Sequence, residues 1–149
     1  MSDVFIMRWP ELGKQVRVRP IRHNRKVFDW FVDNLPIRAL QGHTVVAGEA
    51  LFSLNVSFKK AFPWRDKELA KDNVSTMPTG RFTFFMTVGK VGNISVKYGD
   101  MTEPLSYASW AEVVDEDKAV LAEVGKTIWG IFMGLKKPIV HVEFVKAEG

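Results

Sequence analysis

The sequence of 149 residues contains no cysteine. This absence excludes disulfide bonds, thiolate nucleophiles, zinc sites built on cysteine and iron–sulfur clusters, and it leaves the redox compartment open. The sequence also lacks a GxSxG motif, a phosphate-binding loop and the glycine fingerprint of a dinucleotide site. We therefore expect no nucleotide cofactor.

Long apolar segments are also missing. The N-terminal segment carries an acid at Asp3 and only a four-residue apolar run, which is unlike a signal peptide. No stretch approaches the roughly 20 apolar residues of a membrane span. We expect one cytoplasmic domain over residues 1–149, with no membrane partner.

The net charge of +4 is concentrated near the N-terminus. Residues 1–26 carry seven basic and two acidic side chains, whereas the rest of the chain carries a slight excess of acid. Such a cluster suits an anionic small molecule or a nucleic acid backbone, and it equally suits a solvated strand face. Nucleic-acid binding ranks last, because the cations do not alternate with the exposed aromatic residues of a stacking platform.

Apolar periodicity predicts a mainly β fold with two helices. One helix is expected from a cap at Asn24 to Asn34, and another from a cap at Asp115 to about Met133, before the stop signals at 136–138. The expected strands are 4–9 and 15–21 around a turn at 10–13, then 44–47 and 50–56 (or one strand bent at Gly48), 81–88, 93–98, 109–114 and 139–145.

Two irregular segments combine polar and aromatic side chains. Residues 57–80 form a long connection, with helical turns expected near 65–71, and loops of this length tend to be lids or binding loops. Trp64 suits a lid over a flat or anionic ligand, and equally a hydrophobic anchor or a subunit contact, which leaves a homo-oligomer open. Residues 98–104 crowd hydroxyl and carboxylate groups into a turn that is expected to end the preceding strand.

One carboxylate stands out in the apolar stretch 42–56. Burial there would raise the pKa of the Glu49 carboxyl and suit it to a structural or a proton-handling role. On an unbroken strand His43 and Glu49 would share a face, whereas a bulge at Gly48 would separate them.

A metal site is not expected. His141 and Glu143 alternate on the last strand and could supply two ligands, but a third from His23 or His43 would be needed. An exposed histidine–glutamate pair is the simpler interpretation.

The sequence does contain side chains that could act without a cofactor. Its cations suit a carboxylate substrate, and its carboxylates and histidine suit proton transfer. These residues are Glu49, His43, Arg81, Lys97, Tyr98, Asp100, Thr102 and Glu103.

Several segments carry a family resemblance: AGEALF at 47–52, PTGRFTFF at 78–85, KYGDMTEPL at 97–105, and VGKTIWGIF at 124–132 followed by KKPIVHVEF. Together they resemble a bacterial cyclophilin-like family of small proteins that includes the cucumopine and mikimopine synthases. The resemblance covers nearly the whole chain and implies a closed β-barrel capped by two α-helices. The phenylalanine-histidine-arginine run and the glutamine-glycine-glycine segment of prolyl isomerases are absent, so that activity is not expected.

The resemblance implies a cofactor-independent Pictet–Spengler condensation of an amino acid, such as histidine, with a 2-oxo acid, such as 2-oxoglutarate. Such a reaction needs anion anchors, an acid and a base. The alternatives are a small-molecule-binding protein or another enzyme of the same fold. Under the resemblance Glu49 is the expected base, the expected proton donors are Tyr98, Glu103 or His43, the expected anchors are Arg81 and Lys97 with Lys60 or Arg65, and the other expected substrate contacts are Trp64, Asp100 and Thr102.

Overall fold

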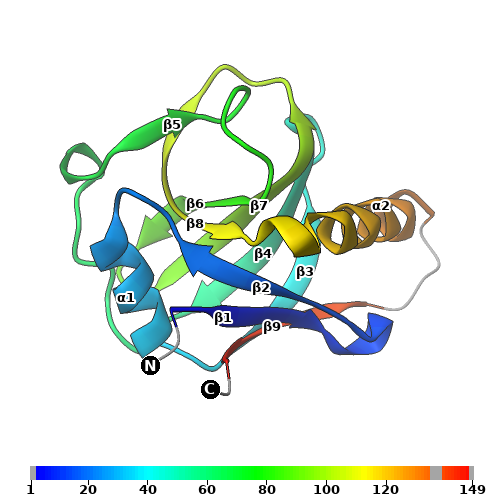
Figure 1. Cartoon of the computed structure of the whole chain (residues 1–149), viewed down its shortest axis with the longest axis horizontal. Coiled ribbons are helices and arrows are strands. Elements are labelled where there is room, and N and C mark those ends of the chain that lie inside the picture. Colours follow the sequence, from blue (N-terminus) through cyan, green and yellow to red (C-terminus); the bar gives the residue numbers. More distant parts are fainter. Residues whose placement is uncertain (1–2, 135–138, 148–149) are drawn as a thin grey trace.

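The computed structural model describes residues 3–134 and 139–147. Within these ranges eight strands form a closed antiparallel barrel in the order β2-β1-β9-β3-β4-β7-β6-β8, and pairing of β8 with β2 closes it (Figure 1). A short additional strand, β5, pairs with the start of β8. The strands are β1 (Phe5–Trp9), β2 (Lys14–Pro20), β3 (Ile37–His43), β4 (Gly48–Ser57), β5 (Lys71–Asn73), β6 (Arg81–Val88), β7 (Val91–Met101), β8 (Ser106–Val113) and β9 (His141–Lys146).

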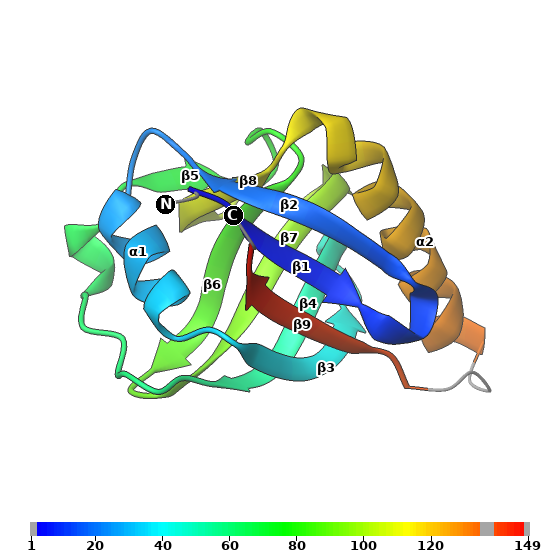
Figure 2. The same cartoon turned by 60° about the horizontal axis from the view of Figure 1, so that its bottom comes forward.

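Two α-helices occur in the described ranges, α1 (Arg25–Asp33) and α2 (Lys118–Gly134). Figures 1 and 2 show them at opposite ends of the barrel. The predicted mainly β barrel with two helices is therefore confirmed. No helix in the described part of the chain is both long enough and apolar enough to cross a membrane.

The helix starts differ in detail from the expected caps. Asn24 precedes α1 with a φ of 58° and makes no capping bond. Its side-chain amide instead donates to the carbonyl oxygens of Ala70 and Ser109, which ties the helix start to β8. Asp115 begins a 3-10 turn, and α2 starts after that turn at Lys118. The stop signals expected at 136–138 lie outside the described residues.

Aromatic rings fill the barrel interior. Phe5, Phe82, Trp110 and Phe144 point inward from their strands and are fully buried. Phe31 of α1 packs on them, with its ring centroid 4.7 Å from that of Trp110 and 5.1 Å from that of Phe5. Each buried ring contributes roughly 1.5–3 kcal/mol through the hydrophobic effect. This core gives the barrel wall a rigid backing.

The hairpin between β3 and β4 differs from the expectation. Residues 44–47 form its tip instead of a strand, and Val45 and Val46 are 75% and 79% exposed. Gly48 follows the tip with a φ of 117°, where a Cβ would lie 2.4 Å from the Asp100 carbonyl oxygen. Only glycine allows the start of β4 to approach the end of β7 this closely.

Strands β6, β7 and β8 also depart from the expected bounds. β7 continues to Met101, so residues 98–101 extend the strand and do not break it. β8 begins earlier than expected, at Ser106. A register shift between Phe85 and Val88, with a φ of 51° at Met86, turns Met86 outward to 74% exposure, although alternation placed it with the core residues.

The basic N-terminal segment is balanced by acids from distant parts of the chain. Arg17 pairs with Asp117 at 3.0 Å, and Arg19 pairs with Glu112 at 2.9 Å. The cationic side chains of β2 are therefore partly neutralised by Glu112 of β8 and by Asp117, which lies just before α2.

Candidate functional site

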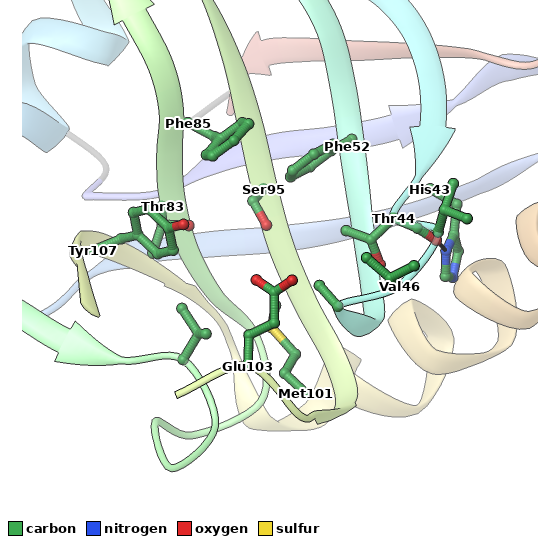
Figure 3. A pocket seen from close by; sticks show the side chains of 13 residues that line it. His43, Thr44, Val46, Phe52, Thr83, Phe85, Ser95, Met101, Glu103 and Tyr107 are labelled. Carbon is green, nitrogen blue, oxygen red and sulfur yellow. Dashed lines mark hydrogen bonds between the residues drawn. The ribbon is translucent and has the colours of Figure 1, made fainter. Parts of the chain in front are cut away.

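A cavity of about 270 Å³ lies on the outer wall of the barrel, over β4, β6 and β7 (Figure 3). Phe52, Thr83, Phe85 and Ser95 point into it, because alternate residues of these strands face outward while their neighbours fill the core. The loop after β7 and the tip of the β3–β4 hairpin form its sides. We call this space the aromatic cavity.

Three aromatic rings shape the aromatic cavity. The rings of Phe52 and Phe85 stack with a centroid separation of 5.7 Å and an interplanar angle of 19°. Tyr107 meets Phe85 edge to face at 6.0 Å. Such an arrangement suits a flat, apolar ligand ring.

Polar groups also line the aromatic cavity. The Glu103 carboxylate points from the loop after β7 toward Ser95 (Figure 3). Within the described residues, neither this carboxylate nor the side-chain hydroxyls of Ser95, Thr83 and Tyr107 make a hydrogen bond or an ion pair. Burial, assisted by the charge of Glu103, raises the pKa of the Tyr107 hydroxyl, so this group is a neutral donor at pH 7. These unpaired groups are available to a ligand.

A second space of about 360 Å³ adjoins the aromatic cavity. The two share the hairpin residues His43, Val45 and Val46 as a common wall. We call this second space the polar hollow, and its other lining residues are Gly48, Glu49, Tyr98, Thr102, Lys126 and Trp129.

His43 is held in one orientation between the two spaces. Its Nδ1 lies 2.6 Å from the Thr44 carbonyl oxygen and its Nε2 lies 2.7 Å from the Tyr98 hydroxyl. Because a carbonyl only accepts, Nδ1 carries the proton and Nε2 accepts the hydrogen bond that Tyr98 donates. Burial lowers the pKa of His43, against the opposing influence of the Thr44 carbonyl and Glu49, so the imidazole is neutral at pH 7.

Glu49 lies in the polar hollow, half-buried, and its Oε1 accepts a hydrogen bond of 3.0 Å from the Asp100 amide. Burial raises the pKa of Tyr98, and the charge of Glu49 adds to that effect. The expected ring of Arg81 and Lys97 around Glu49 is not found, since neither lines this hollow. Lys126 is the basic residue that does.

The two expected anion anchors are occupied elsewhere. Arg81 donates from Nε to Glu112 and from Nη1 to Asp72, both at 3.0 Å. Lys97 is 5% exposed, and its Nζ donates to the carbonyl oxygens of Val74 and Met77 at 2.8 Å each. Lys97 therefore fastens the segment that carries Val74, which forms one side of the aromatic cavity.

The remaining expected residues line neither space. Trp64 packs on Phe62 and Trp30, with centroid separations of 5.4 and 6.2 Å, as the hydrophobic-anchor interpretation requires. Lys60 pairs loosely with Asp33 at 3.6 Å. Arg65 and Asp100 are exposed and line neither space.

The structure thus brings together five of the expected site residues around one hairpin tip. Glu103 lines the aromatic cavity, Glu49, Tyr98 and Thr102 line the polar hollow, and His43 lines both. Sequence reasoning missed the residues Phe52, Phe85, Ser95, Thr83, Tyr107, Lys126 and Trp129. Outward alternation on β6 and β7 was the available signal for three of them, since Thr83 and Phe85 share one face and Ser95 shares a face with Lys97.

No group of three histidine, aspartate or glutamate side chains is arranged to hold a metal ion in residues 3–134 and 139–147. His141 and Glu143 have separate partners. Nδ1 of His141 lies 2.6 Å from Glu11, which lowers the pKa of that carboxyl to about 2, and Glu143 pairs with Arg8 at 2.8 Å. The interpretation of the two as a pair with each other is wrong.

Comparison with known proteins supports the fold. No protein-family model and no curated protein matches this sequence. Among solved structures, McbB in complex with tryptophan resembles it with a TM-score of 0.81 at 23% sequence identity, over 97% of this chain and 45% of the McbB chain. The chain thus spans less than half of McbB. This likeness supports the closed barrel with two helices that the sequence implied, while membership of the opine synthases stays a prediction.

Proposed function

We propose that this chain is a small-molecule condensing enzyme that joins an aromatic amine in the aromatic cavity to a carbonyl compound in the polar hollow by a Pictet–Spengler-type cyclisation. The observation that carries the proposal is the shared wall of the two spaces. The cavity suits a flat ring, the hollow is lined by acid, hydroxyl and lysine side chains, and the two meet at His43, Val45 and Val46. Two adjoining spaces suit two reactants that form a bond with each other.

The aromatic cavity supports the amine side of the reaction. Phe52 and Phe85 provide faces for the ring, and the unpaired carboxylate of Glu103 provides a partner for the ammonium group. The resemblance to McbB, whose structure holds tryptophan, favours an aromatic amine of this size class.

The polar hollow supports the carbonyl side. Lys126 lines it and provides a cation for the carboxylate of a 2-oxo acid. Tyr98 lines it as a neutral hydroxyl, because burial raises its pKa, and its O–H is donated to His43, which it fixes where the two spaces meet.

The proton balance assigns roles to these groups. An ammonium loses a proton before its nitrogen adds to the carbonyl carbon, one proton joins the hydroxyl that leaves as water, and the ring carbon loses a proton after it bonds to the iminium carbon. Glu103 accepts the ammonium proton, returns it to the hydroxyl that leaves as water, and then accepts the ring proton and passes it to solvent, so one water and one proton are released overall. We assign the base to Glu103 in place of Glu49, because Glu49 lies in the other space and is engaged by the Asp100 amide.

Mass spectrometry of mixtures tests this function. Aromatic amines and amino acids are incubated in pairs with 2-oxo acids and the protein, and a product with the summed mass minus one water is expected. Glu103→Gln, which preserves the size of the side chain, should reduce the rate by about 100-fold or more. Glu68→Gln, on an exposed turn, is the matched control and should leave the rate unchanged. Binding without any product would instead indicate a small-molecule-binding protein, and product formed at an equal rate by Glu103→Gln would refute the assigned base.

A further inference from the structure

The ionised groups around the two spaces are unevenly distributed. The aromatic cavity has Glu103 as its acid, and no lysine or arginine is among the described residues that line it. His43, which also lines it, is bonded on both ring nitrogens. The polar hollow adds Glu49 and the single cation Lys126. Two carboxylates thus face one permanent cation.

Cations that could correct this balance are already paired. Arg81 is bonded to Glu112 and Asp72, and the ammonium of Lys97 is buried against two carbonyl oxygens. Freeing either group would leave buried acceptors without partners, which costs about 1–3 kcal/mol for each lost partner. A ligand carboxylate in the aromatic cavity therefore meets no lysine or arginine among the described residues that line it.

We propose that the aromatic cavity selects an arylalkylamine that lacks a carboxylate, in preference to the corresponding amino acid. This inference rests on the proposed function and names the substrate class of the same site. An ammonium beside Glu103 compensates the charge of that carboxylate. An α-carboxylate would lose its hydration among Phe52, Phe85 and Met101 without gaining a partner, and Glu103 would repel it.

The second substrate strengthens this selection. If Lys126 holds the carboxylate of a 2-oxo acid, the condensed intermediate of an amine carries one carboxylate against one lysine. The intermediate of an amino acid carries two carboxylates against the same lysine, beside Glu49 and Glu103. One carboxylate of the amino acid product would therefore stay unpaired.

The dimensions of the cavity favour a small ligand. Its volume of about 270 Å³ lies near the lower end of the range for ligand pockets, roughly 300–1,000 Å³. The rings of Phe52 and Phe85 are nearly parallel, with their centroids 5.7 Å apart. A one-ring or two-ring amine with a short alkyl chain fits these limits.

Calorimetric titration with three matched pairs tests the proposal. The probes are tryptamine and tryptophan, phenethylamine and phenylalanine, and histamine and histidine, each titrated into the wild-type chain. In the pair that binds best, the amine should bind at least tenfold more tightly than its amino acid. Glu103→Gln should weaken binding of that amine by at least tenfold and remove the preference, while Glu68→Gln should change neither affinity.

Each outcome separates this proposal from the proposed function. If the amino acid binds as tightly as the amine or more tightly in every pair, the selection is refuted, and the condensing function stands if those amino acids give product. If an amine binds with the expected preference but no mixture gives a condensed product, the function is refuted and the selection stands. If none of the six probes binds, both are refuted.

Discussion

Tyr98 of β7 lies against Gly125 of α2 so closely that a Cβ on the glycine would be 2.5 Å from three atoms of the tyrosine ring. Real Cβ atoms do not approach other atoms to this distance. The absent side chain at Gly125 therefore lets the Tyr98 ring lie under the helix, from where its hydroxyl reaches His43. A glycine on α2 thus positions a group on the barrel wall.

Gly125→Ala should displace Tyr98 or α2 and destabilise the protein by about 1–3 kcal/mol, the usual cost of overpacking a core. Gly130→Ala is the matched control, because a Cβ there meets nothing within 4 Å. It should stabilise the helix by roughly 0.5–1 kcal/mol, since alanine is the better helix former. Urea unfolding of both variants measures the difference, and equal effects would contradict this account of Tyr98.

Tyr98→Phe preserves the packing on Gly125 and removes the hydroxyl. His43 then keeps a buried acceptor without a partner, at a cost of about 1–3 kcal/mol in the free energy of unfolding. The condensation rate should also fall, because the hydroxyl that fixes His43 where the two spaces meet is lost. Tyr107→Phe removes a hydroxyl that bonds to no described residue, and should leave the stability within about 0.5 kcal/mol of wild type. Similar losses of stability in both variants would count against the assigned hydrogen bond.

The buried imidazole of His43 gives stability a pH dependence of known sign. Burial lowers its pKa in the folded state below the ordinary value of 6.5. As the pH falls, the unfolded chain therefore binds a proton before the folded chain does. The contribution of the neutral imidazole to the free energy of unfolding is present above pH 6.5 and is lost progressively below it. Urea unfolding between pH 8 and 5 should show this decline in the wild type and a flatter curve in His43→Gln. Parallel curves would mean that His43 titrates alike in both states.

Lys97 and Lys126 should respond in opposite ways to replacement by methionine. Lys97→Met leaves the carbonyl oxygens of Val74 and Met77 without a donor, so the protein should lose about 1–3 kcal/mol of stability. Lys126→Met alters an exposed residue and should change stability by less than about 0.5 kcal/mol, while the KM for the 2-oxo acid rises. A stable Lys97→Met protein with only a raised KM would restore Lys97 as the anion anchor.

Local patterns in the sequence predicted the helices and most strands because their apolar stripes are strong. β3 was missed because its sequence, IRALQGH, shows no clear alternation, and one of its two partner strands, β9, lies far along the chain. Val45 and Val46 were wrongly predicted to lie in a strand, since β-branched residues favour strands. They occupy an exposed hairpin tip instead.

The site was predicted in its acids and hydroxyls but not in its cations. Alternation on β7 placed Lys97 on a polar face, yet the segment at 74–77, distant in sequence, covers that face and takes up its ammonium. Arg81 is likewise engaged by Glu112, which follows it by 31 residues. No local pattern reveals which ionic groups find partners across a barrel. Arg81 and Lys97 could therefore be predicted as anchors from the sequence, although the fold engages both of them outside the two spaces.

A crystal structure of the chain with tryptamine tests the central claim most directly. The account predicts that the indole lies over Phe52 and Phe85 and that the ammonium nitrogen lies within about 3 Å of a Glu103 carboxylate oxygen. An indole in this cavity with its ammonium directed away from Glu103, or tryptamine bound elsewhere on the barrel, would contradict it.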